Sequence, residues 1–142
     1  MRKLVLSMIC VGTMYFSGKS QCDKNFQFES SKTEYQDAQG NVQRSIDEHA
    51  VIKVTGKEIT ITPESDHKMV AYIKSSTCNW KVPYKEGKLT LNAVYMEKDV
   101  EKKTVLVFEG KDNKVSMSMT FEAEPGKVIK VWADKFEEIK LP

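Results

Sequence analysis

The chain has 142 residues, a formal net charge of +2 and 30% charged residues. Arg2 and Arg44 are its only arginines, and the remaining basic residues are lysines. Because arginine is the usual residue for bidentate contacts to phosphate and guanine, this near-neutral, lysine-dominated composition argues against a nucleic-acid-binding protein.

The first 20 residues have the pattern of a secretory signal peptide. Two basic residues are followed by an apolar run over residues 4–16, and Gly18 and Ser20 place small side chains before a predicted cleavage site at Gln21. The apolar run would extend roughly 20 Å as a helix, less than the ~30 Å of a bilayer core. The alternative is an uncleaved membrane or interfacial anchor.

Cleavage would leave one domain over residues 21–142. Removing three of the 22 basic residues and none of the 20 acidic ones changes the net charge to 19 − 20 = −1. No second apolar run of membrane length follows, so we expect no transmembrane segment in the mature chain. The expected location is periplasmic or extracellular.

Cleavage would also leave two cysteines, Cys22 and Cys78. Oxidising compartments preserve disulfides, so we predict a bridge between them. The bridge would close a loop of 57 residues, counted from 22 to 78 inclusive. Such a loop is worth roughly 4 kcal/mol in the chain-entropy model. The alternative is two unrelated thiols.

Two other uses of the cysteines are disfavoured. A lipid anchor on Cys22 would need small or leucine-like residues where the chain has Lys19 and Gln21. A zinc site would need a close cysteine pair, and only His49 and His67 are available to join the cysteines. We therefore expect neither lipidation nor a bound metal.

From residue 26 onward the sequence alternates apolar and polar residues with period two, which is typical of β-strands. The segment VSMSMTF at residues 115–121 is the clearest case. A last strand is predicted within residues 134–140, with a single helical turn as the alternative. The other predicted strands cover residues 26–35, 42–46, 50–55, 58–63, 69–75, 88–96, 103–109, 115–122 and 128–133.

Short segments rich in Gly, Asp, Asn and Pro separate these strands at hairpin distances. No helical stretch intervenes, so the pattern predicts an all-β antiparallel meander of eight or nine strands, counted without the last segment at 134–140. Closure removes exposed edges and favours a small barrel or half-open barrel. An antiparallel β-sandwich is the alternative. Residues 75–87 form the least regular segment, and we expect a loop there.

The segments FQFESSKTEYQDAQGN and VIKVTGKEITI are followed by paired hairpins with Lys, Asp and Gly in their turns. This arrangement resembles the small secreted lipocalin-like β-proteins of Bacteroidota. The resemblance lies in the patterning and extends from Phe26 to Ile139. It implies a barrel-like fold in the cell envelope and no particular activity.

Aromatic and methionine side chains on the predicted strands are candidates to line a barrel lumen. Methionine adapts to varied apolar ligands, and aromatic residues add area with a polar handle. The alternative is a solid core, because small barrels fill their interior with their own side chains. The predicted ligand-binding residues are Tyr72, Tyr95, Phe108, Met117, Met119 and Trp132.

The predicted loop 75–87 is a second candidate site. It carries Trp80, Pro83 and Tyr84 close to Cys78, and a disulfide there would hold these aromatic anchors for a protein partner. In the alternative interpretation, Trp80 folds inward and plugs one end of the barrel.

No catalytic motif is present. Ser45, Asp47, Glu48 and His49 are close in sequence, as are Ser65, Asp66 and His67, but successive residues on an extended strand point to opposite sides, so closeness in sequence does not make them a triad. We therefore expect a non-catalytic exported binding protein without a cofactor, possessing a lumen for a small apolar or amphiphilic ligand. The alternative function is a protein interaction module or an inhibitor of an extracellular enzyme that uses residues 75–87.

Overall fold

The computed structural model describes residues 22, 24–64 and 67–140, so the predicted signal peptide lies outside the described residues. The described residues form nine β-strands and no helix. The strands are β1 (Phe26–Gln36), β2 (Val42–Thr55), β3 (Glu58–Pro63), β4 (Met69–Val82), β5 (Glu86–Glu97), β6 (Val100–Lys111), β7 (Lys114–Phe121), β8 (Val128–Trp132) and β9 (Lys135–Glu138).

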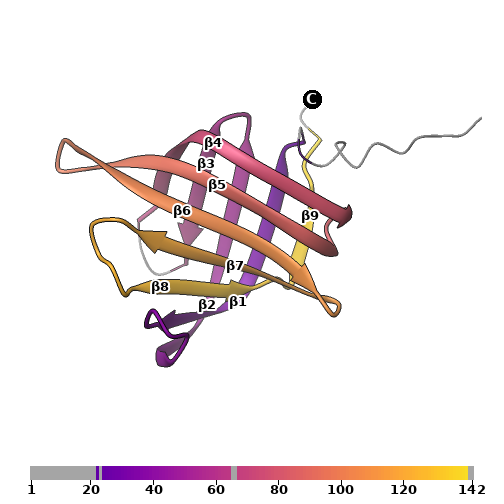
Figure 1. Cartoon of the computed structure of the whole chain (residues 1–142), viewed down its shortest axis with the longest axis horizontal. Coiled ribbons are helices and arrows are strands. Elements are labelled where there is room, and N and C mark those ends of the chain that lie inside the picture. The colour runs from indigo at the N-terminus through magenta and orange to yellow at the C-terminus, as the bar shows by residue number, and fades with distance from the viewer. Residues whose placement is uncertain (1–21, 23, 65–66, 141–142) are drawn as a thin grey trace, which may run out of the picture.

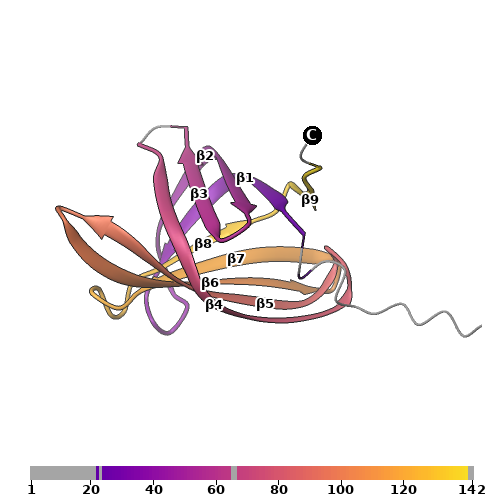
Figure 2. The ribbon, with the colours of Figure 1, turned by 90° about the horizontal axis from the view of Figure 1, so that it is seen from above.

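The strands close into a barrel. Each strand from β1 to β7 pairs antiparallel with the next, and β8 pairs with β1, so that eight strands complete the ring. Strands β4–β7 cross one side, and β1–β3 cross the other side at a steep angle (Figures 1 and 2). The predicted all-β antiparallel barrel is confirmed, and the sandwich alternative is excluded.

The ninth strand completes the edge of β1. Thr33–Gln36 pair with β8, whereas Phe26–Glu29 pair with β9. Between the two pairings the amide of Asp134 donates to the carbonyl of Glu29 at 2.8 Å. The predicted final strand is confirmed, and it extends over the end of the barrel opposite the β1–β2 turn (Figure 1).

The barrel interior follows the alternation seen in the sequence. On β6, Leu106 and Phe108 are fully buried, and their partners on β7 are Met119 and Met117. A register shift in β1 between Ser30 and Lys32 changes which residues point inward. Phe26, Phe28 and Ser30 are buried before the shift, and Thr33 is buried after it.

Two strands are longer than the sequence predicted. The segments 42–46 and 50–55 belong to the single strand β2, because the polar residues between them continue its pairing with β1. The predicted loop 75–87 is wrong for residues 75–82, which continue β4. A register shift between Ile73 and Ser75 interrupts the alternation there, and the exposed polar residues that follow still pair with β5.

The predicted disulfide between Cys22 and Cys78 is confirmed, with 5.9 Å between the Cα atoms. It connects the chain just before β1 to the middle of β4, two strands separated in the sheet by β2 and β3. Because the Cys22 sulfur is part of this bridge, it is not available as a thiol that could carry a lipid. The bridge therefore fixes one end of the barrel with a contact that strand pairing does not supply.

Candidate functional site

The interior of the barrel differs between its two ends. One end contains packed aromatic rings, and the other contains a cavity of about 420 Å³. This volume falls within the range of about 300–1,000 Å³ that is usual for small-molecule sites. We call this cavity the lumen cavity. Its lining residues are Thr33, Tyr35, Arg44, Ile46, Glu48, Ala50, Ile52, Ile61, Pro63, His67, Met69, Met117, Met119, Phe121, Ile129 and Val131.

The walls of the lumen cavity are mainly apolar and come from both sides of the barrel. Met117 and Met119 on β7 pair with Val131 and Ile129 on β8, so these four side chains share one inner face. The inner residues of β2 and β3 form the facing wall. Because methionine is flexible and polarisable, this wall can adapt to ligands of different shape.

Exposure along the inner face of β2 defines the mouth and the floor of the cavity. Arg44 is exposed, Ile46 is half-buried, and Ala50 and Ile52 are buried. Arg44 therefore lies at the mouth, beside the β1–β2 turn. Its guanidinium carbon lies 5.5 Å from the centre of the Tyr35 ring, within the range of a cation–π contact.

The lining also contains an acidic residue, Glu48, and a histidine, His67. Glu48 comes from β2 and is half-buried, and His67 precedes β4 and is exposed. Both residues take part in interactions of their own. The lumen cavity thus has an apolar interior and a polar mouth, which suits an amphiphilic molecule.

The opposite end of the barrel is closed by an aromatic cluster around Phe136 of β9. The Phe136 ring centroid lies 4.9 Å from that of Tyr84 and 5.3 Å from that of Phe26. Phe28, Trp80 and Phe108 also contact this ring, at centroid distances of 5.6, 5.8 and 5.9 Å. We call these six residues the aromatic plug. They exclude this end of the lumen as a ligand entrance.

The predicted lumen residues divide into two groups. Met117 and Met119 line the lumen cavity, and Phe108 belongs to the aromatic plug. Tyr95 is half-buried on the inner face of β5, with its ring centroid 5.9 Å from that of Phe121. The structure thus places four of the predicted side chains inside the barrel.

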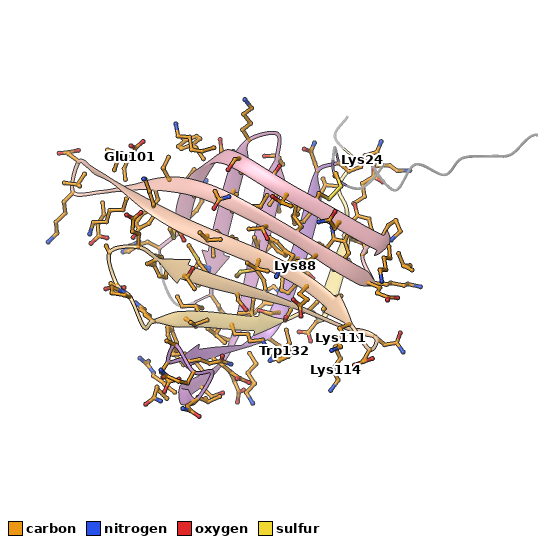
Figure 3. The ribbon with its side chains drawn as sticks, viewed as in Figure 1. Lys24, Lys88, Glu101, Lys111, Lys114 and Trp132 are labelled. Atoms are coloured by element: carbon orange, nitrogen blue, oxygen red, sulfur yellow. A yellow bond between two sulfur atoms is a disulfide. The ribbon has the colours of Figure 1, made fainter. Side chains whose placement is uncertain are left out.

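Tyr72 and Trp132 do not lie in the lumen, and this part of the prediction is wrong. Tyr72 is 51% exposed and Trp132 is 38% exposed. Both follow a buried inner-face residue by one position, so strand alternation points them outward. Trp132 lines an open outer groove of about 610 Å³ with Lys114 and other charged residues, at the end of the barrel away from Glu101 (Figure 3).

The predicted partner-binding residues are also separated by the fold. Trp80 is only 5% exposed and belongs to the aromatic plug, as the alternative interpretation had it. Pro83 is exposed in the β4–β5 turn, and Tyr84 is half-buried against Phe136. Burial and the negative charge of Glu138 raise the pKa of Tyr84 to about 12. These residues therefore form no exposed aromatic surface.

Sequence reasoning missed the residues at the mouth of the lumen cavity, above all Arg44 and Tyr35. A usable signal was present, because Arg44 is the only arginine after the predicted leader and lies at an alternate position of a strand. Its alignment with the lumen depends on the register of β1 against β2, where Tyr35 and Arg44 are partners.

Comparison of the sequence with protein-family models and with curated proteins finds no match. Within residues 24–64 and 67–140, no helix has the length and hydrophobicity needed to cross a bilayer. The same part of the chain contains no group of three His, Cys, Asp or Glu side chains placed to hold a metal ion. The lumen cavity, with its apolar walls and polar mouth, is the best-formed candidate site among the described residues.

Proposed function

We propose that the protein is a non-catalytic, exported binding protein that holds a small apolar or amphiphilic ligand in the lumen cavity. The observation that carries the proposal is the contrast between the two ends of the barrel. The aromatic plug fills one end, whereas about 420 Å³ stays open at the other, among Met117, Met119 and other apolar side chains. Apolar pockets with a few convergent polar groups are the usual form of small-molecule sites.

Export is supported by the disulfide between Cys22 and Cys78, because such bridges persist in oxidising compartments. It is also supported by the leader-like pattern of the first 20 residues. A periplasmic or extracellular location would bring the lumen cavity into contact with ligands of the cell envelope or its surroundings.

The proposal is tested with a neutral apolar fluorophore, N-phenyl-1-naphthylamine, whose emission rises in apolar surroundings. We expect the wild-type protein to bind it. The variant Ile46→Trp places a larger side chain in the mouth and should weaken binding by about tenfold or more. Ser45→Trp is the matched control, since the neighbouring side chain on β2 points away from the lumen.

Two results would contradict the proposal. The first is a wild-type protein that leaves the emission unchanged at any usable concentration. The second is equal binding by Ile46→Trp and Ser45→Trp, which would move the fluorophore outside the lumen cavity. Circular dichroism of both variants checks that each retains the β-fold.

The alternative function, protein interaction or enzyme inhibition through residues 75–87, stays a prediction. The burial of Trp80 removes its main anchor, and Pro83 with the exposed Val82 is what the β4–β5 turn offers to a partner. The lumen cavity is the better supported site.

A further inference from the structure

We infer that the ligand of the lumen cavity is an amphiphile with a single carboxylate head, bound by Arg44 at the mouth while its apolar chain lies among the methionines. This inference rests on the proposed function and specifies the chemical class of the ligand. Three observations support it: the position of Arg44, the state of the acidic groups around it, and its chemical type.

Arg44 lies where a head group would lie. It is exposed at the rim, and the inner face of β2 continues from it through Ile46 to the buried Ala50 and Ile52. An extended apolar chain that follows this face would have its polar end beside Arg44. The contact with the Tyr35 ring at 5.5 Å holds the guanidinium near the lumen instead of leaving it free in solvent.

The described acidic groups near the mouth do not pair with Arg44. Asp37 lines the hollow on the outer side of Arg44, and its Oδ1 accepts from the amides of Asn41 and Gln39 at 2.9 and 3.0 Å. Glu48, deeper in the lumen, also has an interaction of its own. Among the described residues no carboxylate lies within salt-bridge distance of Arg44. Arg44 is therefore a positive charge at the mouth that no described carboxylate pairs with.

The type of this residue indicates the type of anion. A guanidinium presents a planar fork of donors that matches the two oxygens of a carboxylate, and lysine does not offer this geometry. One positive charge balances one carboxylate. A phosphate monoester carries about −1.5 to −2 at pH 7 and would leave part of its charge unneutralised in the mouth. The fork fits either anion, and the match of one positive charge to one negative charge favours a carboxylate.

The test compares probes with the same 12-carbon chain and different heads: dodecanoate, dodecan-1-ol and dodecylamine. Each displaces the neutral fluorophore N-phenyl-1-naphthylamine from the wild-type protein. A charge-assisted hydrogen bond contributes about 1.5–3 kcal/mol, so dodecanoate should bind about tenfold or more tightly than dodecan-1-ol. Dodecylamine should bind more weakly than either.

Variants locate the head group. Arg44→Gln should bring dodecanoate to the affinity of dodecan-1-ol, and Arg44→Lys should retain only part of the preference because it lacks the fork. Lys53→Gln is the matched control, since it removes one positive charge from the outer, exposed side of the same strand. The affinity for dodecan-1-ol should be unchanged in all three variants, which checks that the lumen cavity is intact.

The outcomes separate this inference from the proposed function. Equal binding of the three probes would overturn the carboxylate inference and leave the proposed function standing. A preference for dodecanoate that survives Arg44→Gln would overturn the assignment to Arg44. Failure of the fluorophore and of all three probes to bind would overturn the proposed function itself.

Discussion

Tyr84 shows how the closed end of the barrel affects a single side chain. Its ring packs edge-on against Phe136, and its backbone has a φ of 61° in the β4–β5 turn. Burial and the charge of Glu138 raise the pKa of Tyr84 from 10.0 to about 12. The neutral phenol is therefore favoured in the folded protein, and stability at alkaline pH should depend on this residue.

The sign of that dependence follows from proton linkage. Between pH 10 and about 12 the unfolded chain loses the Tyr84 proton while the folded protein keeps it. This contribution to the free energy of unfolding is thus complete below pH 10 and is lost as the pH rises through 12. Urea unfolding across this range should show the decrease in the wild type and a smaller decrease in Tyr84→Phe.

The control for this experiment is Tyr72→Phe, which removes a hydroxyl from an exposed ring on β4 and leaves Tyr84 in place. It should retain the decrease seen in the wild type. If Tyr84→Phe and Tyr72→Phe give the same profile as the wild type, Tyr84 does not carry the effect.

Gly87 shows why Trp80 could be mistaken for a surface residue. The sequence places Gly87 in a turn-like segment, but in the structure it is a residue of β5 opposite Trp80. A Cβ at Gly87 would lie 2.6 Å from the Cα of Trp80, and the φ of Gly87 is +137°. The absence of a side chain therefore lets the backbone of β4 approach closely. No periodicity in a single strand reveals such a cross-strand fit.

At the scale of the elements, the tightest turns depend on backbone conformations that their residues do not favour. The β5–β6 turn has Lys98 and Asp99 at φ values of 49° and 63°. Two positive φ values between paired strands define the turn type that favours Asn-Gly. We expect the double change Lys98→Asn and Asp99→Gly to stabilise the protein by about 0.5–1 kcal/mol, measured by thermal unfolding.

The same change at the β1–β2 turn is the matched control. Ala38 and Gln39 do not have positive φ, so Ala38→Asn with Gln39→Gly should give no gain. Glycine there adds flexibility to the unfolded chain and should lower stability slightly. A gain of similar size at both turns would mean that turn conformation is not its cause.

Most strands could be predicted from the sequence because one face of each is buried and the period of two is visible. β7 is the clearest example, since Met117 and Met119 are buried on its inner face while Ser118 and Thr120 between and after them are more exposed. The failures occur where the alternation changes phase. The register shift after Ile73 hides the second half of β4 from a pattern search, and the polar centre of β2 hides its continuity with residues 50–55.

At the scale of the whole molecule, the sequence predicted the content of the lumen better than its geometry. Met117 and Met119 were predictable because an alternating strand must bury one of its faces. Arg44 could be noticed as a lone arginine, but its position at the mouth could not be predicted, because it depends on the pairing of Arg44 with Tyr35 between β1 and β2. The side on which Trp132 lies depends likewise on β8 pairing with both β7 and β1. A site that forms when the barrel closes can be located only from the pairing of the strands in the closed barrel.

The disulfide that stabilises the barrel and the cavity proposed to bind a ligand lie in different parts of the molecule. The disulfide lies outside the set of side chains that line the lumen cavity, while Cys22 and Cys78 both pack against the buried core. Removing the bridge by Cys22→Ser with Cys78→Ser should therefore lower the free energy of unfolding by roughly 4 kcal/mol, through the entropy of the unfolded chain. Urea unfolding measures this loss, and reductant should reproduce it in the wild type without affecting the double variant.

Binding should respond differently to the same change. At a temperature where the double variant is still folded, its affinity for N-phenyl-1-naphthylamine should equal that of the wild type, because the mouth and the methionine wall keep their strand pairing. Ile46→Trp should show the opposite behaviour, with weakened binding and a smaller effect on stability at its half-buried position. If the double variant loses stability and affinity together, the two ends of the barrel are coupled, and the lumen cavity depends on the bridge for its shape.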